Sequence, residues 1–434
     1  MKRCSLFGRG GQHMAINLAK GVHLHVLPTT KYKTIQLSIK FKTPLKDGTA
    51  TKRTMAANLL EINSKHYPTQ TAFRTKLSEL YGAGFGTNVS KKGNYHILSV
   101  GMTIVNDKFV NMESNLLKEA VDFLNDILFH PHANDIGFDK ATFDREKDKL
   151  ADDYDSLFDD KQTYAKLALQ RLMFEDKNQQ LPSIGTKEEL MSITNETLLN
   201  DYQEMIKNDE IDIYVLGDVA KEKVVEVFKT LNFTDRDVKK VPVFYHEAAV
   251  SSVNEQAERQ EITQAKYNLG YTTPIFYHGK QYYAGQVFNG LFGGYPHSKL
   301  FMNVREKESL AYYASSSLNT FDGTMVVQTG IDSKEVEKVK TIVAQQLKEL
   351  QKGNFSQEDF EQTKSMLKNN VIQSEDNPGS IIERVYANHL ALGEVIDIQD
   401  WISNIDRVTK EEVIAVAEQV QLKATFFLTG GATE

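Results

Sequence analysis

The sequence predicts an α+β protein made of two tandem homologous domains, each a mostly antiparallel sheet packed by helices. Three observations predict this fold class. Short apolar stretches with a period of two, typical of strands with one buried face, are separated by longer stretches of helical periodicity. These elements follow the same order in both halves of the chain. Two local sequence patterns also recur, which indicates an internal duplication.

The N-terminal half opens with two strands. Val22, Leu24 and Val26 alternate with polar residues, and residues 35–41 alternate in the same way. Each stretch therefore predicts a strand that buries one face. Helices and a glycine-punctuated strand pair follow, and a capped helix leads into a buried strand. The expected ranges are 51–65 and 69–81 for helices, 82–105 for the strand pair, 111–129 and 138–174 for helices, 193–206 for the capped helix and 211–219 for the last strand.

The C-terminal half repeats this order. It is expected to hold a strand at 261–273, helices at 279–291 and 298–307, a strand pair at 311–331, helices at 334–352 and 357–374, a capped helix at 408–420 and a closing strand at 424–432. Each type of element rests on the same two periodicities as in the first half.

The two halves also share local sequence. Leu80 aligns with Leu310, and Gly93 with Gly323, at an offset of 230 residues. The polar stretch between the halves breaks both periodicities and is expected to be a linker. The predicted organisation is a first domain over 1–232, a linker over 233–257 and a second domain over 258–434.

Composition narrows the function classes. The chain has 434 residues, 41% of them hydrophobic and 25% charged, with a net charge of −7, which argues against nucleic acid as a partner. No stretch has the roughly 20 apolar residues of a membrane span, and the N-terminus lacks the uninterrupted apolar core of a signal peptide. Cys4 is the only cysteine, so an internal disulfide and a thiolate metal cluster are excluded. We expect a cytoplasmic globular protein.

Two segments carry a family resemblance. One is "TMAANLLEINSKHYPTQ" at 54–70, and the other is "HSKLFMNVREKESLAYYASSS" at 297–317. Together with the two-copy plan, they resemble the pitrilysin/insulinase family of zinc peptidases, the inverzincins. The resemblance implies a clam-shaped chain whose first half carries H-x-x-E-H on a helix. In that motif two histidines bind zinc and the glutamate takes a proton from the zinc-bound water.

The first half lacks the metal ligands of that motif. Its five positions are occupied by Asn58, Leu59, Leu60, Glu61 and Ile62, so the base remains and both histidines are absent. Further along the chain, "TFDREKDKLADDYDS" resembles the family segment that supplies the third ligand, with Glu146 at its first acid and Asp153 at the ligand position. His66 lies one turn beyond the motif, past the expected end of the helix. Because a catalytic zinc takes three protein ligands, we expect no metal in this chain and a helix that packs its apolar residues, with Glu61 solvated or hydrogen-bonded.

The second half keeps a substrate-binding pattern. The segment 298–312 resembles the family pattern S-x-L-x-x-x-(V/L)-R-(E/D)-x-x-(G/S)-L-A-Y, which places Arg305 and Tyr312 where active members contact the substrate carbonyl and backbone. Guanidinium and phenol groups suit that role because both donate hydrogen bonds to an oxyanion. The other interpretation pairs Arg305 with a neighbouring acid and makes Tyr312 the start of a core strand. Gly293 and Gly294 lie in a predicted glycine loop, and the resemblance implies that this loop touches substrate.

Four further histidines are weaker candidates for a functional site. His23 and His25 share one face of a strand and can be solvated or form a metal pair, and His130 and His132 mark a helix exit with no acidic partner at fixed spacing. We expect solvated histidines at the first pair. No G-x-S-x-G motif is present, so a serine hydrolase is excluded.

The resemblance favours the inactive bacterial branch of the family, the YmfF-like proteins. It implies a non-catalytic subunit of a heterodimeric zinc endopeptidase, with zinc in a partner that carries an intact H-x-x-E-H and an extended peptide as substrate. A homodimer stays open. The alternatives are a structural or peptide-binding protein with no part in proteolysis, and an active peptidase with unusual ligands.

Overall fold

The computed structural model describes residues 15–110, 115–248 and 251–430. Cys4 lies outside the described residues, as do 111–114 of a predicted helix, 249–250 of the predicted linker and 431–432 of the predicted closing strand. The chain forms two compact units. The first unit comprises Met1–Asp155, Pro182–Pro242 and Asn377–Val395, and the second comprises Ser156–Leu181, Val243–Asp376 and Ile396–Glu434. The units thus differ from the predicted sequence halves by two exchanged segments, 156–181 and 377–395.

The first unit is built on a six-stranded sheet with the strand order β1-β2-β6-β3-β5-β4. The strands are β1 (Ile16–Ala19), β2 (Val22–Pro28), β3 (Thr34–Pro44), β4 (Gly84–Lys92), β5 (Tyr95–Val105) and β6 (Glu210–Gly217). All neighbours are antiparallel except β2 and β6, which run parallel.

The second unit is built on a five-stranded sheet with the strand order β7-β11-β8-β10-β9. The strands are β7 (Asn254–Gln260), β8 (Ala265–Thr272), β9 (Ala311–Asn319), β10 (Thr324–Ile331) and β11 (Gln421–Gly430). Here too one pair, β7 and β11, is parallel and the other pairs are antiparallel. The predicted fold class, two mostly antiparallel sheets packed by helices, is confirmed.

The two sheets share one topology. Without β1, the order in the first sheet matches the second strand for strand, and the parallel pair occupies the same place in both. Gly93 and Gly323 both have positive φ, at 56° and 62°, in the hairpin that joins the last two strands of each sheet. Glycine suits this position because it adopts positive φ without a Cβ clash. These equivalences support the internal duplication.

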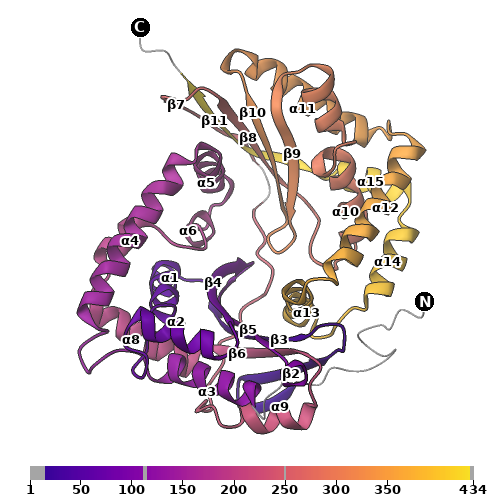
Figure 1. Cartoon of the computed structure of the whole chain (residues 1–434). Helices are drawn as coiled ribbons and strands as arrows, with labels where there is room; N and C mark the ends of the chain where they lie inside the picture. The colour runs from indigo at the N-terminus through magenta and orange to yellow at the C-terminus, as the bar shows by residue number, and fades with distance from the viewer. Residues whose placement is uncertain (1–14, 111–114, 249–250, 431–434) are drawn as a thin grey trace. The chain divides into compact units, whose positions relative to one another are not determined.

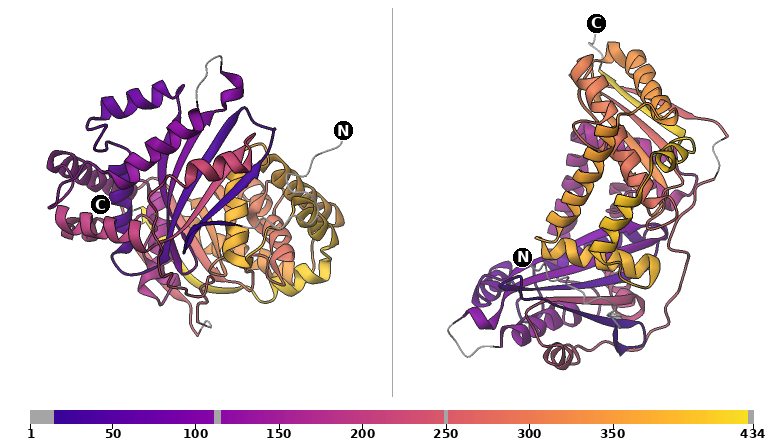
Figure 2. Two further views of the ribbon diagram at one scale, coloured as in Figure 1. Left: turned by 90° about the horizontal axis from the view of Figure 1, so that it is seen from below. Right: turned by 90° about the vertical axis from the view of Figure 1, so that its right-hand side faces the viewer.

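Helices pack on the first sheet. The helices up to α9 are α1 (Thr49–Leu60), α2 (Gln70–Glu79), α3 (Leu116–Phe129), α4 (Lys140–Asp159), α5 (Lys161–Met173), α6 (Lys177–Gln180), α7 (Lys187–Ser192), α8 (Asn195–Asn208) and α9 (Lys221–Phe228). Of these, α5, α6 and the last turn of α4 belong to the second unit. In Figure 1, α3 and α9 lie on one side of the sheet and α13 (Pro378–Leu392) on the other. The side view in Figure 2 shows the same arrangement. The capping box predicted at Thr194 is present.

Two predicted helices end earlier than expected. The helix predicted over 51–65 ends at Leu60, because Asn63 donates to Thr142 Oγ1 at 3.0 Å and Ser64 donates to Asp126. These tertiary hydrogen bonds compete with the helical ones. The helix predicted over 138–174 is two helices, since Asp160 caps the second by accepting from Gln162 N.

The second sheet has helices on both faces. Its main core joins β8 and β10 to α10 (Tyr282–Asn289), α11 (Val336–Gln351) and α15 (Lys410–Ala417), and α12 (Gln357–Ser374) and α14 (Ile398–Arg407) complete the layer. The other face packs against α5 through a smaller apolar cluster that includes Leu169 and Phe426. Gly270 permits this contact, because a Cβ there would lie 2.4 Å from Met173 Sδ.

The segment predicted as a linker is divided between the units: its residues up to Pro242 belong to the first unit, and those from Val243 belong to the second. Arg236 donates to the carbonyls of Ile206 and Asp209, both at 3.1 Å, and Val241 N donates to the Tyr95 hydroxyl at 3.0 Å. Strand β7 begins at Asn254, inside the predicted linker range. Among the described residues, no helix has the length and apolarity needed to cross a membrane.

Candidate functional site

Glu61, the acid retained from the H-x-x-E-H pattern, is bound to the neighbouring edge strand. It follows the last residue of α1, is half-buried, and its Oε1 accepts from Thr87 N at 2.5 Å. The Thr87 hydroxyl lies 2.7 Å from the same oxygen and 3.1 Å from Ala57 O. Of the two fates considered for Glu61, the structure therefore shows the hydrogen-bonded one, and this carboxylate ties α1 to β4.

The other residues of the motif do not fit a zinc ion. Ile62 is 8% exposed and offers no ligand atom, while Asn58 is half-buried beside it. Asp153 is exposed on α4, and buried Glu146 is bonded through Oε1 to Arg145 at 3.0 Å. Within the described ranges, no group of three or more His, Cys, Asp or Glu side chains could hold a metal ion. The donor set lacks the three ligands that a catalytic zinc needs.

His66 has an acidic partner that spacing does not reveal. Its Nδ1 bonds to Asp126, whose other oxygen accepts from Ser64, and its ring lies 6.0 Å from that of His130. Asp126 is 60 residues away in sequence, so only the fold of α3 against the end of α1 brings the two together. His66 thus belongs to a structural cluster at the exit of α1.

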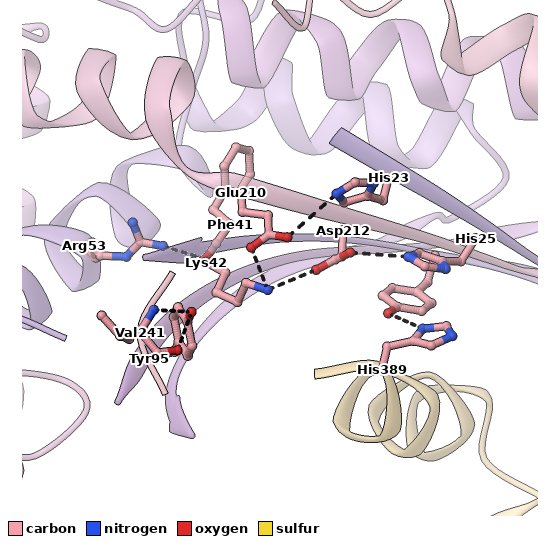
Figure 3. Close-up of polar contacts among 11 residues, drawn as sticks. His23, His25, Phe41, Lys42, Arg53, Tyr95, Glu210, Asp212, Val241 and His389 are labelled. Atoms are coloured by element: carbon pink, nitrogen blue, oxygen red, sulfur yellow. Dashed lines mark hydrogen bonds and ion pairs between the residues drawn. The ribbon is translucent and has the colours of Figure 1, made fainter. Parts of the chain in front are cut away.

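A network of charged groups covers the polar face of the first sheet (Figure 3). Lys42 Nζ lies 2.9 Å from Glu210 Oε2 and 3.9 Å from Asp212 Oδ2. His23 reaches Glu210 at 3.7 Å and His25 reaches Asp212 at 3.3 Å. These side chains share one face because they occupy alternate positions of β2, β3 and β6. Each buried charge therefore has an opposite charge beside it.

Helix α13 packs over this network on the polar face of the sheet. His389 Nδ1 lies 3.0 Å from the Tyr214 hydroxyl, and its ring stacks on His25 with 4.5 Å between centroids. Tyr214 also stacks on His25, with 4.5 Å between the centroids, and the Tyr214 and His389 rings lie 6.1 Å apart. The expectation of two solvated histidines is wrong for His25, which is 6% exposed. It fails because a helix from the far end of the sequence covers the polar face.

The network shifts the pKa values of its members in opposite directions. The hydrogen bond to Glu210 raises the pKa of His23. Burial alone would raise the pKa of Asp212, but the hydrogen bond from His25 and the charge of Lys42 lower it. Glu210 behaves in the same way: burial opposes the change, but His23 and Lys42 lower its pKa.

The stability of the first unit is expected to depend on pH on both sides of a maximum. The lowered pKa values of Glu210 and Asp212 contribute stability that is lost as the pH falls below their ordinary values of 4.5 and 3.8. The raised pKa of His23 contributes stability that is lost as the pH rises above 6.5. Denaturant unfolding across this range should show both losses. His23→Gln should remove the loss above pH 6.5 and reduce the loss at low pH, because His23 also lowers the pKa of Glu210. An unchanged profile in that variant would contradict the assignment.

Arg305 lies in an irregular helix of the second unit. The segment η3 (Phe301–Lys307) is a π-helix, a rare form that is frequent at functional sites. The Arg305 side chain is 43% exposed, its guanidinium lies 4.6 Å from the centre of the Phe301 ring, and its Nε is 3.6 Å from Glu306 Oε1. A neighbouring acid is therefore present, but the contact is loose and the guanidinium faces solvent.

Tyr312 occupies a β-bulge at the start of edge strand β9. Gly330 of β10 pairs with Tyr313 and the next residue, Ile331, pairs with Ala311, so Tyr312 is the extra residue. Bulges re-aim side chains and are common beside active sites. Tyr312 is 76% exposed, whereas the Tyr313 hydroxyl is hidden from solvent and Lys266 lies 5.3 Å from the Tyr313 ring. The other interpretation made Tyr312 the start of a core strand, but β9 is an edge strand among the described strands and the Tyr312 side chain at the bulge faces solvent.

Ser309 connects the two predicted substrate residues in a strained conformation. Its φ is 52°, in the left-handed region where a side chain costs free energy. The family pattern allows only glycine or serine at this position, which fits that geometry. An irregular helix, a left-handed residue and a bulge thus fall within twelve residues of one segment, 301–312.

Substitutions of Ser309 should report this strain. Ser309→Val is expected to lower the free energy of unfolding by about 1–2 kcal/mol, because a β-branched residue resists positive φ. Ser309→Gly should not lower it, since glycine adopts this region freely. Denaturant titration of both variants checks the expectation, and equal stability of the valine variant and the native chain would show that the position is unstrained.

The predicted glycine loop is a second π-helix, η2 (Gly290–Gly294), that continues α10. Gly293 is buried, and a Cβ there would lie 2.6 Å from Ser316 N of β9. Gly294 is exposed. The prediction of a loop is wrong, because close packing on β9 continues the helical path. Gly293 serves that packing, and the substrate role of Gly293 and Gly294 stays a prediction.

Comparison with known proteins agrees with this geometry. A family model described as the peptidase M16 inactive domain matches residues 192–367. The "Probable inactive metalloprotease YmfF" of Bacillus subtilis is 35% identical over 410 residues, which cover 94% of this chain and 96% of that protein. The chain therefore belongs to the M16 peptidase family, the pitrilysin/insulinase family of the predicted resemblance. It is an inactive insulinase-like peptidase homologue, similar to YmfF along nearly its whole length.

Other relatives include proteins named as proteases. The "Uncharacterized zinc protease YmxG" of Bacillus subtilis is 23% identical over 307 residues, 69% of this chain and 72% of that protein. A conserved protein from Enterococcus faecalis V583 has a solved structure with 46% identity and a TM-score of 0.94, covering 98% of this chain and 100% of that one. The peptidase M16 inactive domain from Pseudomonas fluorescens shares the fold, with a TM-score of 0.80 at 14% identity, over 97% and 99% of the two chains.

Proposed function

We propose that this chain is the non-catalytic subunit of a heterodimeric zinc endopeptidase of the cytoplasm. The partner carries the zinc in an intact H-x-x-E-H, and this chain contributes Arg305 and Tyr312 to the substrate. The pair acts in peptide processing or turnover. A purely structural or peptide-binding protein is the competing function.

The contrast between the two units carries this proposal. The described residues of the first unit offer no group of ligands for zinc, and the remaining acid, Glu61, accepts a hydrogen bond from Thr87. In the second unit, Arg305 and Tyr312 are both exposed on an irregular segment. A chain with no peptidase role has no need for an exposed arginine on a π-helix and an exposed tyrosine on a bulge. An enzyme whose active site is divided between two chains needs such residues in the chain without zinc.

The edge strand β9 supports binding of an extended peptide. Among the described strands it pairs only with β10, so its other edge offers backbone groups for a further strand. Strand addition reads the backbone more than the side chains of a ligand. Tyr312 lies near the start of this strand and can donate to a bound peptide from its exposed hydroxyl.

The relatives in one organism are consistent with a pair. Bacillus subtilis holds both YmfF, named as inactive, and YmxG, named as a zinc protease. These two similarities supply the two kinds of chain that a divided site requires. The partner of this chain is accordingly sought among homologues of its own organism with an intact motif.

Reconstitution from purified chains tests the proposal. This chain alone should not cleave an unstructured quenched-fluorescence peptide, and an H-x-x-E-H homologue from the same organism should cleave it poorly. The mixture should cleave it at a rate that saturates at a 1:1 ratio. A homologue that is fully active alone and unaffected by this chain would favour the competing function.

A further inference from the structure

The polar face of the first sheet carries a groove of about 450 Å³, a volume typical of ligand sites. A row of small residues forms its floor, and a row of polar residues forms one wall. The floor residues, paired across β3, β5 and β4, are Ser38, Gly101 and Gly86, and the wall residues, two positions away on each strand, are Lys40, Ser99 and Asn88. Glycines within strands mark places where a ligand can approach the backbone closely. The groove therefore has room for a ligand beside Lys40.

Lys40 is a buried cation in the wall of this groove. Its side chain is 2% exposed, and its Nζ donates to Ser99 Oγ at 3.3 Å and lies 4.8 Å from the centre of the Tyr386 ring. Its charge is paired with that of Glu383 from α13, which lies on this side of the sheet (Figure 1). A buried charge costs free energy unless an opposite charge accompanies it. Lys40 therefore needs a carboxylate at this position.

Glu383 is shared between two lysines. Its Oε2 also lies 3.8 Å from Lys92 Nζ, and its side chain is 51% exposed. Burial lowers the pKa of Lys92, and Glu383 opposes this change while the charge of Lys40 adds to it. Asp212, which pairs with Lys40 on the neighbouring strand β6, has its side chain 3.9 Å from Lys42 Nζ, as part of the charged network. Two cations at this end of the groove thus share the carboxylate of Glu383.

We propose that this groove binds a carboxylate of a ligand at Lys40, in the place that Glu383 fills. The exchange of one carboxylate for another keeps the buried cation paired. Glu383 can move to solvent at little cost, because half of its side chain is exposed already. The carboxylate belongs either to an acidic side chain of an extended peptide or to a free organic acid. The inference concerns the first unit alone and does not rest on the proposed function.

The fold itself does not require charge on this face. In the second sheet, which shares the strand order, the face opposite the main helical layer packs on α5 through an apolar cluster that includes Leu169 and Phe426. The same architecture thus accepts an apolar surface at this place. The buried lysine of the first sheet is therefore not a requirement of the sheet, and a ligand carboxylate gives it a role.

Glu383→Gln tests the proposal on the purified chain without any partner. Glutarate, and a peptide with blocked ends and a single glutamate, are titrated into the native chain and the variant at low ionic strength, and calorimetry gives the affinities. We expect at least about tenfold tighter binding of a carboxylate ligand by Glu383→Gln, because the competing carboxylate is gone. Lys40→Met should weaken binding at least about tenfold for the same reason of charge. A peptide with glutamine in place of its glutamate should gain nothing from Glu383→Gln.

Two further variants locate the site. A Cβ on Gly101 would meet its nearest neighbour, Gly86 O, at 3.7 Å, which is ordinary contact, so Gly101→Leu keeps the sheet and fills the floor of the groove. It should abolish binding of the peptide, whereas glutarate, which needs only Lys40, should still bind. Glu79→Gln changes an exposed glutamate of α2 and should match the native chain.

The outcomes separate the two sources of the carboxylate. Binding of the peptide identifies an acidic side chain as the ligand, and binding of glutarate alone identifies a free acid. No gain in affinity for either ligand in Glu383→Gln would overturn the proposal, and so would native-like binding by Lys40→Met. If Lys40→Met does not fold, the comparison of Glu383→Gln with the native chain decides alone. The reconstitution result stays independent, because no peptidase partner is present in this experiment.

Discussion

Arg305→Ala and Tyr312→Phe are each expected to lower turnover by the reconstituted pair about 10²–10³-fold. In the proposed divided site, both groups donate hydrogen bonds where charge develops on the substrate carbonyl, and removal of one such donor typically has this effect. Their exposure means that neither holds the chain together: Arg305 is 43% and Tyr312 76% exposed. Both variants should therefore still form the complex with the partner, as measured by size-exclusion chromatography.

Matched controls separate this role from a general loss of structure. Tyr313→Phe alters the neighbouring tyrosine, whose hydroxyl is hidden and has no hydrogen-bond partner in the described structure, and should leave turnover unchanged. Arg407→Ala removes an exposed arginine elsewhere in the second unit and should do the same. Unchanged turnover in both Arg305→Ala and Tyr312→Phe would refute the proposed role of the pair. So would a loss of turnover that follows dissociation of the complex.

The largest expected effect on stability is that of Lys42→Ala. The Lys42 side chain is 9% exposed and is the cation between Glu210 and Asp212. Burial alone would lower its pKa, but the two carboxylates raise it, which shows that their attraction outweighs desolvation. Its removal leaves two buried carboxylates without that charge. Loss of one partner of a buried pair costs about 3–5 kcal/mol, and we expect a decrease of about 3 kcal/mol because His23 and His25 remain.

The first unit also offers an exposed ion pair for comparison. Lys20 and Asp237 are 67% and 93% exposed and lie 2.5 Å apart, so Lys20→Ala should have no measurable effect on unfolding. Asp212→Asn added to Lys42→Ala should restore part of the lost stability, because it removes one uncompensated charge. Denaturant titration of the variants measures these differences. Equal losses for Lys42→Ala and Lys20→Ala would show that the network does not stabilise the unit.

Periodicity predicts most of the fold, because each strand and helix with one apolar face carries its own pattern. The strands β2, β3, β8 and β10 all lie where alternation places them. The packing of helix α13 on the first sheet is not predicted from the sequence. Its contacts join residues far apart in the chain, such as His389 and Tyr214, and a local sequence pattern does not show which distant residues are in contact. The same reason explains why Asp126 beside His66 was not foreseen.

The candidate site also has features that the sequence predicts and features that it does not. Residue types alone show that Asn58 and Ile62 cannot replace histidine ligands. The bulge at Tyr312, the positive φ of Ser309 and the π-helix around Arg305 are backbone irregularities. They arise from the packing of η2 and η3 on β9 and have no periodic signature. Glu61 is predicted as a retained acid, but its bond to Thr87 depends on the position of β4.

In the proposed enzyme, this chain is one half of a divided peptidase site. A pull-down of the tagged chain from a lysate of its own organism, with the co-purified proteins identified by mass spectrometry, tests this division. We expect a stoichiometric companion of similar length that carries an intact H-x-x-E-H. A chain that purifies alone, or only with copies of itself, would contradict the divided site and favour a structural or peptide-binding role.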